Sequence, residues 1–152
     1  MRTEILILIF LILLLITYFI LVRGERKKIS ILNSDGSKIS LDVEFANSTA
    51  TSLKGLMGRS SLDENSGMLF IFDRPGTYGF WMLNTTIPLE AIHFNENFTV
   101  VDIVEMKPCG LNVIACKTYY PKEFSLYVLE VNSGFSKKHG VEIGKSRLKL
   151  EN

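Results

Sequence analysis

The sequence predicts a mainly β fold: a compact antiparallel sandwich or barrel with two short helices, preceded by one transmembrane helix. Two observations lead to this prediction. Residues 5–22 carry no charged side chain, and the rest of the chain divides into short apolar segments separated by turn residues. We therefore expect an N-terminal tail at residues 1–4, an anchor at residues 5–22, a linker at residues 23–28 and one β-rich domain at residues 29–152.

The apolar run from Ile5 to Val22 is close to the roughly 20 residues that cross a bilayer core. The basic residues that follow it are Arg23, Arg26, Lys27 and Lys28. A cleaved signal peptide is the main alternative, but its apolar region is normally about 7–15 residues long and ends in small residues. A core helix would show a polar face, which this run lacks. We therefore expect an uncleaved anchor whose partner is the lipid bilayer.

Two signals disagree about the side of the membrane on which the domain lies. Basic residues are more numerous after the apolar run than before it, where Arg2 stands alone, and this favours the cytoplasm. The cysteine pair Cys109 and Cys116 instead suits a disulfide in an oxidising compartment. Glycosylation sequons begin at Asn47, Asn84 and Asn97. We expect an extracytoplasmic domain, with the cytoplasm as the alternative.

The β-rich part of the chain can be divided into elements by its alternation of apolar and polar residues. Strands are expected at residues 28–33, 38–45, 67–72, 78–82, 89–94, 98–107, 124–131 and 146–150. One helix should follow Asn47 and end near Gly58, and a second should run from Ser133 to Gly140. Turns are expected at residues 34–37, 73–76 and 95–97, and residues 108–121 should form a loop.

Several motifs resemble the family catalogued as domain of unknown function 192. They are Gly55-Leu-Met-Gly-Arg59, Gly67-Met-Leu-Phe-Ile-Phe72 and Phe80-Trp-Met-Leu-Asn-Thr-Thr-Ile-Pro-Leu-Glu90. The resemblance covers about residues 30–150 and implies a small, β-rich, exported or membrane-anchored domain. It implies no catalytic residue, because the function of that family is not established. Glu90 stands where the family usually has the shorter aspartate.

Large and polar side chains gather in these motifs and form a candidate ligand site: Arg59, Trp81, Asn84, Thr85 and Glu90. Trp81 can stack on a flat ligand or sugar, and the polar members can hydrogen-bond hydroxyls, carboxylates or phosphates. The patch would take a small molecule or a cell-envelope partner. A purely structural module, with Trp81 in the core and Arg59 paired to a carboxylate, is the alternative.

A hydrolytic enzyme that uses Glu90 and His93, or nearby carboxylates, is a second alternative. Residues three apart on a strand face opposite sides, which argues against a dyad of these two. The spacing of Cys109 and Cys116 is not Cys-x-x-Cys, so a structural disulfide is favoured over a redox or zinc site.

Composition and spacing give no support for other partners. The methionines 57, 68, 82 and 106 match no metal-binding spacing, and methionine is an ordinary filler of cores. We therefore expect no metal and no cofactor. The formal net charge of +1 gives no electrostatic case for nucleic acid.

Overall fold

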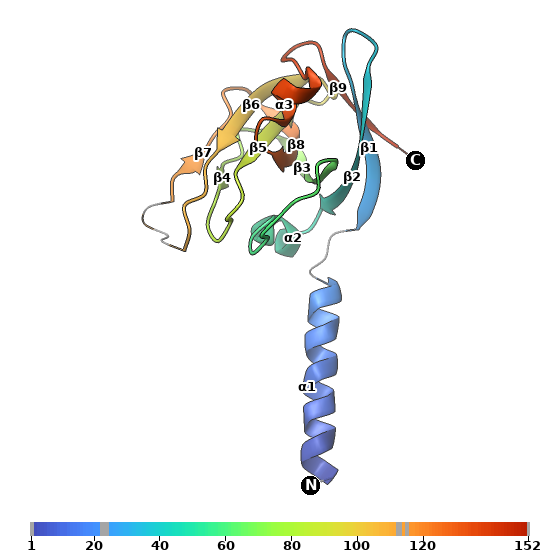
Figure 1. The fold of residues 1–152 in the computed structure, drawn as a ribbon, viewed down its shortest axis with the longest axis vertical. Coiled ribbons are helices and arrows are strands. Elements are labelled where there is room, and N and C mark those ends of the chain that lie inside the picture. Colours follow the sequence, from blue (N-terminus) through green and yellow to red (C-terminus); the bar gives the residue numbers. More distant parts are fainter. Residues whose placement is uncertain (1, 22–24, 112–113, 115, 152) are drawn as a thin grey trace.

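A computed structural model describes residues 2–21, 25–111, 114 and 116–151 of the chain (Figure 1). The strands are β1 (Arg26–Leu32), β2 (Lys38–Ala46), β3 (Ser66–Gly76), β4 (Phe80–Trp81), β5 (Leu89–Phe94), β6 (Val100–Met106), β7 (Thr118–Tyr119), β8 (Ser125–Asn132) and β9 (Arg147–Leu150). The helices are α1 (Arg2–Leu21), α2 (Thr49–Lys54) and α3 (Phe135–His139). The predictions of a mainly β fold and of two short helices after the N-terminal segment are confirmed.

The main sheet has seven strands in the order β6-β5-β8-β3-β2-β1-β9. All neighbours are antiparallel except β2 and β3, which run parallel. The chain leaves the end of β2, passes through α2 and returns to the start of β3, so the two strands enter the sheet in the same direction. The sheet is therefore mixed, and the prediction of a wholly antiparallel sheet was wrong at this crossover.

The sheet curls until its two edge strands meet at one end. Thr99 and Arg147 form an antiparallel bridge there. Beside it, the Leu148 amide donates to the Phe98 carbonyl at 2.8 Å, which joins the start of β6 to β9. The enclosed face holds a core of fully buried aliphatic and aromatic side chains, among them Ile29, Ile31, Val43, Leu69, Ile92, Phe94, Leu129 and Val131. The fold is thus closer to the predicted barrel than to a sandwich.

The second face of the same sheet carries its own apolar layer. Met68, Phe70, Met82 and Met106 are buried there. This layer is covered by α2 and by the small two-stranded sheet of β4 and β7. Alternation along each strand assigns residues to one layer or the other, so both faces of the sheet are buried.

Four local predictions need correction. Residues 108–121 were expected to form a loop, but Thr118–Tyr119 form strand β7. The first helix was expected to end near Gly58, but α2 ends at Lys54. Residues 73–76 were expected to form a turn, but β3 continues through them to Gly76. Pro75 has no amide hydrogen for the ladder, and the pairing with β8 shifts register between Ile71 and Gly76. The expected strand at residues 78–82 is reduced to Phe80–Trp81, which leaves the main sheet and pairs with β7.

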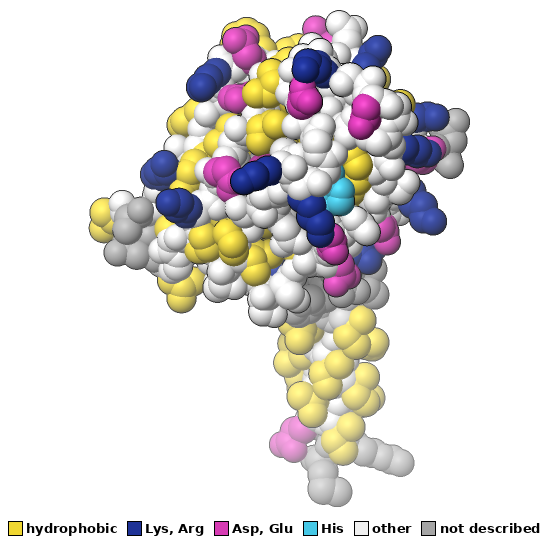
Figure 2. Space-filling view, turned by 45° about the horizontal axis from the view of Figure 1, so that its top comes forward, with side chains coloured by type: hydrophobic (Ala, Val, Ile, Leu, Met, Phe, Trp, Pro, Cys, Tyr) yellow, Lys and Arg dark blue, Asp and Glu magenta, His cyan; other side chains and the backbone are white. Residues whose placement is uncertain are grey.

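Helix α1 lies outside the β domain, and its described apolar side chains are exposed (Figure 1; Figure 2). Judged on the described residues alone, no helix has the length and apolarity needed to cross a membrane. The predicted membrane span is therefore unsupported here. Residues 22–24, which include the end of the predicted anchor and the start of the predicted linker, lie outside the described residues.

Candidate functional site

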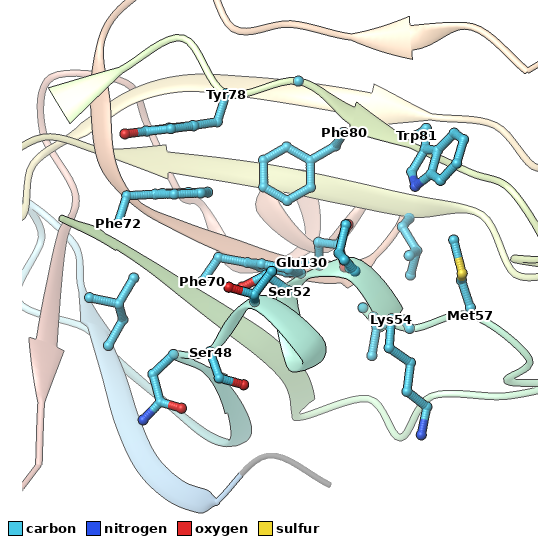
Figure 3. Close-up of a pocket in the computed structure, with 18 of the residues that line it drawn as sticks. Ser48, Ser52, Lys54, Met57, Phe70, Phe72, Tyr78, Phe80, Trp81 and Glu130 are labelled. Carbon is cyan, nitrogen blue, oxygen red and sulfur yellow. The ribbon is translucent and has the colours of Figure 1, made fainter. Parts of the chain in front are cut away.

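A pocket of about 650 Å³ opens on the second face of the sheet, between α2, β3, β4 and β8 (Figure 3). Five of the residues that line it are aromatic: Phe70, Phe72, Tyr78, Phe80 and Trp81. Its polar lining comprises Ser48, Ser52, Lys54, Asp73, Arg74, Thr85 and Glu130, among others. We call this cavity the aromatic pocket.

The aromatic walls follow from strand geometry. Phe70 and Phe72 are two residues apart on β3, so both side chains project from the same face of the sheet. The Phe72 and Tyr78 rings stack with centroids 3.5 Å apart and planes 5° apart. The Phe70 and Phe80 rings meet edge to face at 5.0 Å. Trp81 completes the wall, and 43% of its surface stays exposed.

Gly79 allows β4 to approach its neighbours closely enough to form this wall. A Cβ atom on Gly79 would lie 2.5 Å from the Tyr120 ring and 2.6 Å from the Thr118 side chain. A Cβ atom at position 79 would therefore force the Tyr120 ring and the Thr118 side chain to move. Glycine lets β4 pair with β7 without that displacement, and this pairing positions Phe80 and Trp81 at the pocket.

Helix α2 forms the opposite wall. Its N-cap is Ser48, which makes a reciprocal capping box with Thr51. The helix ends at Gly55, whose backbone has φ +49°. A Cβ atom there would be 3.7 Å from the Phe70 ring and 3.9 Å from the Glu130 carboxylate. The end of α2 thus lies directly over the innermost polar group of the pocket.

That group is the carboxyl of Glu130, on β8, which lies inside the sheet between β5 and β3. Its neighbours in register are Met68 on β3 and Ala91 on β5, and only 4% of its surface is exposed. Burial raises the pKa of Glu130 to about 8, because the ionised form loses its hydration. Within the described part of the chain, the structure shows no hydrogen bond or ion pair to this carboxyl.

The five predicted ligand residues do not converge on one site. Trp81 and Thr85 line the aromatic pocket. Arg59 lies on the same side of the sheet, but its Nη2 donates to the Glu44 Oε2 at 2.6 Å, so its guanidinium serves an ion pair. Asn84 is exposed, has φ 52° and contributes backbone hydrogen bonds to a turn. Its carbonyl oxygen accepts a hydrogen bond from the Gly58 amide at 2.7 Å.

Glu90 lies on the enclosed face of the sheet, away from Trp81. Its Oε1 accepts hydrogen bonds from the Ser136 amide at 2.9 Å and from the Ser136 hydroxyl, which tie α3 to β5. Only 2% of Glu90 is exposed. Burial raises the pKa of Glu90, and the facing carboxylate of Glu105 adds to that effect. The structure thus gives Glu90 a role in holding α3.

His93 faces the other side of the sheet from Glu90, as the spacing of three residues predicted. Its Nδ1 is 3.1 Å from the Ser125 hydroxyl, and Asp102 is its partner in register on β6. Burial lowers the pKa of His93 to about 4. Serine, histidine and aspartate meet here, but all three are buried, and the Asp102 carboxylate accepts from the Lys122 amide at 2.7 Å. A substrate cannot reach this cluster, so we assign it to the core.

The cysteine pair has the geometry that was expected of it. The Cα atoms of Cys109 and Cys116 are 5.3 Å apart and their sulfur atoms lie within disulfide distance. No cluster of histidine, cysteine and acidic side chains suited to a metal ion occurs in the described ranges. Met68, Met82 and Met106 are buried in the second apolar layer, whereas Met57 lies at the pocket.

The fold and the pocket together define a small curled-sheet domain with a lined cavity on one face. Comparison with known proteins makes the assignment more specific: the chain belongs to the DUF192 family, whose model, described as an uncharacterized ACR, matches residues 30–148. No curated protein matches the sequence.

Two solved structures are similar to this chain. One is a candidate transcription regulator from Sinorhizobium meliloti 1021, which is 28% identical, with a TM-score of 0.75 and coverage of 84% of this chain and 95% of that chain. The other is a protein of unknown function from Novosphingobium aromaticivorans DSM 12444. It is 25% identical, with a TM-score of 0.72 and coverage of 84% and 86%. The family and these relatives establish the fold and leave the function open.

Glu130 is the pocket residue that sequence reasoning missed. It occurs in the segment Phe124–Val131, where apolar residues occupy both faces of the expected strand. A strand that is apolar on both faces is buried on both faces, so a glutamate within it must also be buried. That pattern was the available signal.

Proposed function

We propose that this domain binds a small organic ligand in the aromatic pocket. The observation that carries the proposal is a cavity of about 650 Å³ whose walls are aromatic and whose floor holds one buried carboxyl. Ligand sites typically have volumes of about 300–1,000 Å³, apolar walls and a few polar groups that fix orientation. The pocket has all three properties.

The shape of the pocket supports binding over a purely structural role for the motif. A motif that served only the core would bury its tryptophan, yet Trp81 keeps 43% of its surface exposed at the cavity. Aromatic faces that are held in place before binding lose little side-chain entropy when a ligand packs on them. The Phe72–Tyr78 stack and the Phe70–Phe80 contact hold the rings in this way.

A plugging variant tests the proposal. Ser52 projects from α2 toward the cavity (Figure 3), so Ser52→Phe should fill it. Ser40 is exposed on β2, and Ser40→Phe is the matched control. The full-length chain in a nonionic detergent would be screened with monocyclic fragments by saturation-transfer NMR. We expect fragments that bind the natural chain and the Ser40→Phe variant but not the Ser52→Phe variant. Equal binding to all three would show that the pocket is not the site.

We further propose that residues 5–22 anchor the domain to a membrane and that the domain lies outside the cytoplasm. The proposal is supported by the charge-free run and by the exposure of the described apolar side chains of α1, which find no cover in the β domain. The cysteine pair supports an oxidising compartment.

The redox state of Cys109 and Cys116 in intact cells tests the location. Cells would be quenched with acid, denatured, and labelled with a heavy maleimide with and without reductant. Thiols that react only after reduction are expected for an extracytoplasmic domain. Thiols that react at once would place the domain in the cytoplasm, as the count of basic residues favours.

A further inference from the structure

We infer that the ligand of the aromatic pocket is an organic cation, an alkylammonium or quaternary ammonium group that lies between the aromatic walls and the Glu130 carboxylate. This inference rests on the proposed function of the pocket and names its ligand class. It depends on three features: the isolated carboxyl, the aromatic rings that line the cavity, and the positions of the nearby basic side chains.

The first feature is the buried carboxyl of Glu130, to which the described residues supply no ion-pair partner. Glu130 lies on an interior strand of the sheet, between Met68 and Ala91, where an apolar side chain would be the stable choice. Its carboxyl is directed at the cavity and 4% of the residue is exposed. Among the described residues, the structure shows no cation paired with it. Without a counter-charge such an acid keeps its proton, because burial raises its pKa. A cation beside it would stabilise the ionised form, and a ligand can supply that cation.

The second feature is the chemistry of the walls. The face of an aromatic ring attracts a cation within about 6 Å of its centroid, and sets of such rings recognise alkylated ammonium groups. Phe70, Phe72, Tyr78, Phe80 and Trp81 surround the cavity on the side opposite α2 (Figure 3). An alkylammonium presents methyl groups to these rings and a diffuse charge to the carboxylate, so one ligand group satisfies both features of the pocket.

The third feature is the position of the basic side chains at the rim. Lys54 belongs to the pocket lining, but its amine points away from Glu130 in Figure 3. Arg74 is exposed on the far part of β3, next to Asp73. Neither side chain forms an ion pair with Glu130 in the structure. The place beside the carboxylate is therefore left to a ligand, and an anionic ligand would meet Glu130 unfavourably at the floor.

The experiment compares cations with neutral molecules of the same shape. The probes are choline and benzyltrimethylammonium, and their neutral partners are 3,3-dimethylbutan-1-ol and neopentylbenzene. Each would be titrated into the full-length chain in nonionic detergent at constant ionic strength. Trp81 is the only tryptophan of the chain, so its fluorescence reports directly on the pocket. We expect each cation to bind at least about tenfold more tightly than its neutral partner.

Two variants assign this preference to the pocket. Glu130→Gln keeps the shape of the side chain and removes its charge, so each cation should then bind no more tightly than its neutral partner. Phe72→Leu removes one ring face from the wall and should weaken the cations several-fold more than the neutral probes. The second variant keeps the test decisive if Glu130→Gln fails to fold.

The outcomes separate this inference from the proposed function. Cations that bind no more tightly than their neutral partners, or not at all, overturn the cation inference. If the fragments of the plugging experiment still distinguish Ser52→Phe from Ser40→Phe, the pocket remains a ligand site for another class of molecule. If those fragments bind both variants equally, the proposed function is overturned as well.

Discussion

Replacing Glu130 by glutamine is expected to change how the free energy of unfolding depends on pH. Burial raises the pKa of Glu130 from 4.5 to about 8. Between these two values the folded protein keeps a proton that the unfolded chain has released. Stability therefore falls as the pH rises through this window, because the unfolded state binds fewer protons. Glutamine does not titrate, so the variant lacks this part of the dependence.

The size of the effect follows from the pKa shift. One pKa unit corresponds to ~1.4 kcal/mol, so the loss of stability amounts to about 3 kcal/mol between pH 4.5 and 7 and to about 4 kcal/mol by pH 8. Glu90 and His93 also have shifted pKa values, but they are present in both proteins. The difference between the natural chain and Glu130→Gln thus isolates position 130.

The assay is urea denaturation of both full-length proteins in nonionic detergent between pH 5 and 8, followed by Trp81 fluorescence. Glu96→Gln, at an exposed turn between β5 and β6, is the matched control. We expect the stability advantage of Glu130→Gln over the natural chain to grow steadily with pH, while Glu96→Gln follows the natural chain. A pH-independent difference would show that Glu130 ionises at its ordinary pKa, and the assignment of a buried, unpaired acid would be refuted.

Three further predictions concern other parts of the fold. Burial lowers the pKa of the His93 imidazole to about 4, so the ring should stay neutral in NMR titrations down to about pH 5. The free energy of unfolding should fall as the pH drops below 6.5, because the unfolded chain takes up the proton first. Titration of His93 near pH 6.5 would contradict its burial. Glu90→Ala should cost about 1–3 kcal/mol of stability by urea denaturation, since the Ser136 amide and hydroxyl lose their acceptor, while fragment binding stays unchanged. Impaired binding in a stable Glu90→Ala protein would return Glu90 to the site. Reducing the bond between Cys109 and Cys116 should lower the stability by about 2 kcal/mol, and no change in the melting temperature with reductant would argue that the bond does not form.

Local patterns predicted most strands of the domain well. The alternating segments around Asp35-Gly36 form the β1–β2 hairpin, and those around residues 95–97 form the β5–β6 hairpin. Both are contacts between neighbours in sequence, where turn residues and a period of two carry the information. The helix after Asn47 was also found, because its capping residue Ser48 is a local signal.

The candidate site was harder to predict because it is assembled from distant elements. Alternation along β5 correctly separates Glu90 from His93, but no local rule relates the face of Glu90 to that of Trp81 on another strand. The crossover that makes β2 and β3 parallel decides where α2 lies, and so decides which residues meet at the pocket. Glu130 joins the pocket only because β8 lies between β5 and β3 in the sheet.

The pairing of β9 with β1 determines when, during synthesis of the chain, the domain can finish folding. These strands come from opposite ends of the β domain, and Ile31 on β1 faces Leu148 on β9 in register. A chain still being synthesised has no partner for this edge of β1 until residue 150 has emerged. Contacts so distant in sequence are slow to form. The domain should therefore complete its fold only after residues 147–150 have been synthesised, and a chain truncated before Arg147 should be cleaved more readily by proteases.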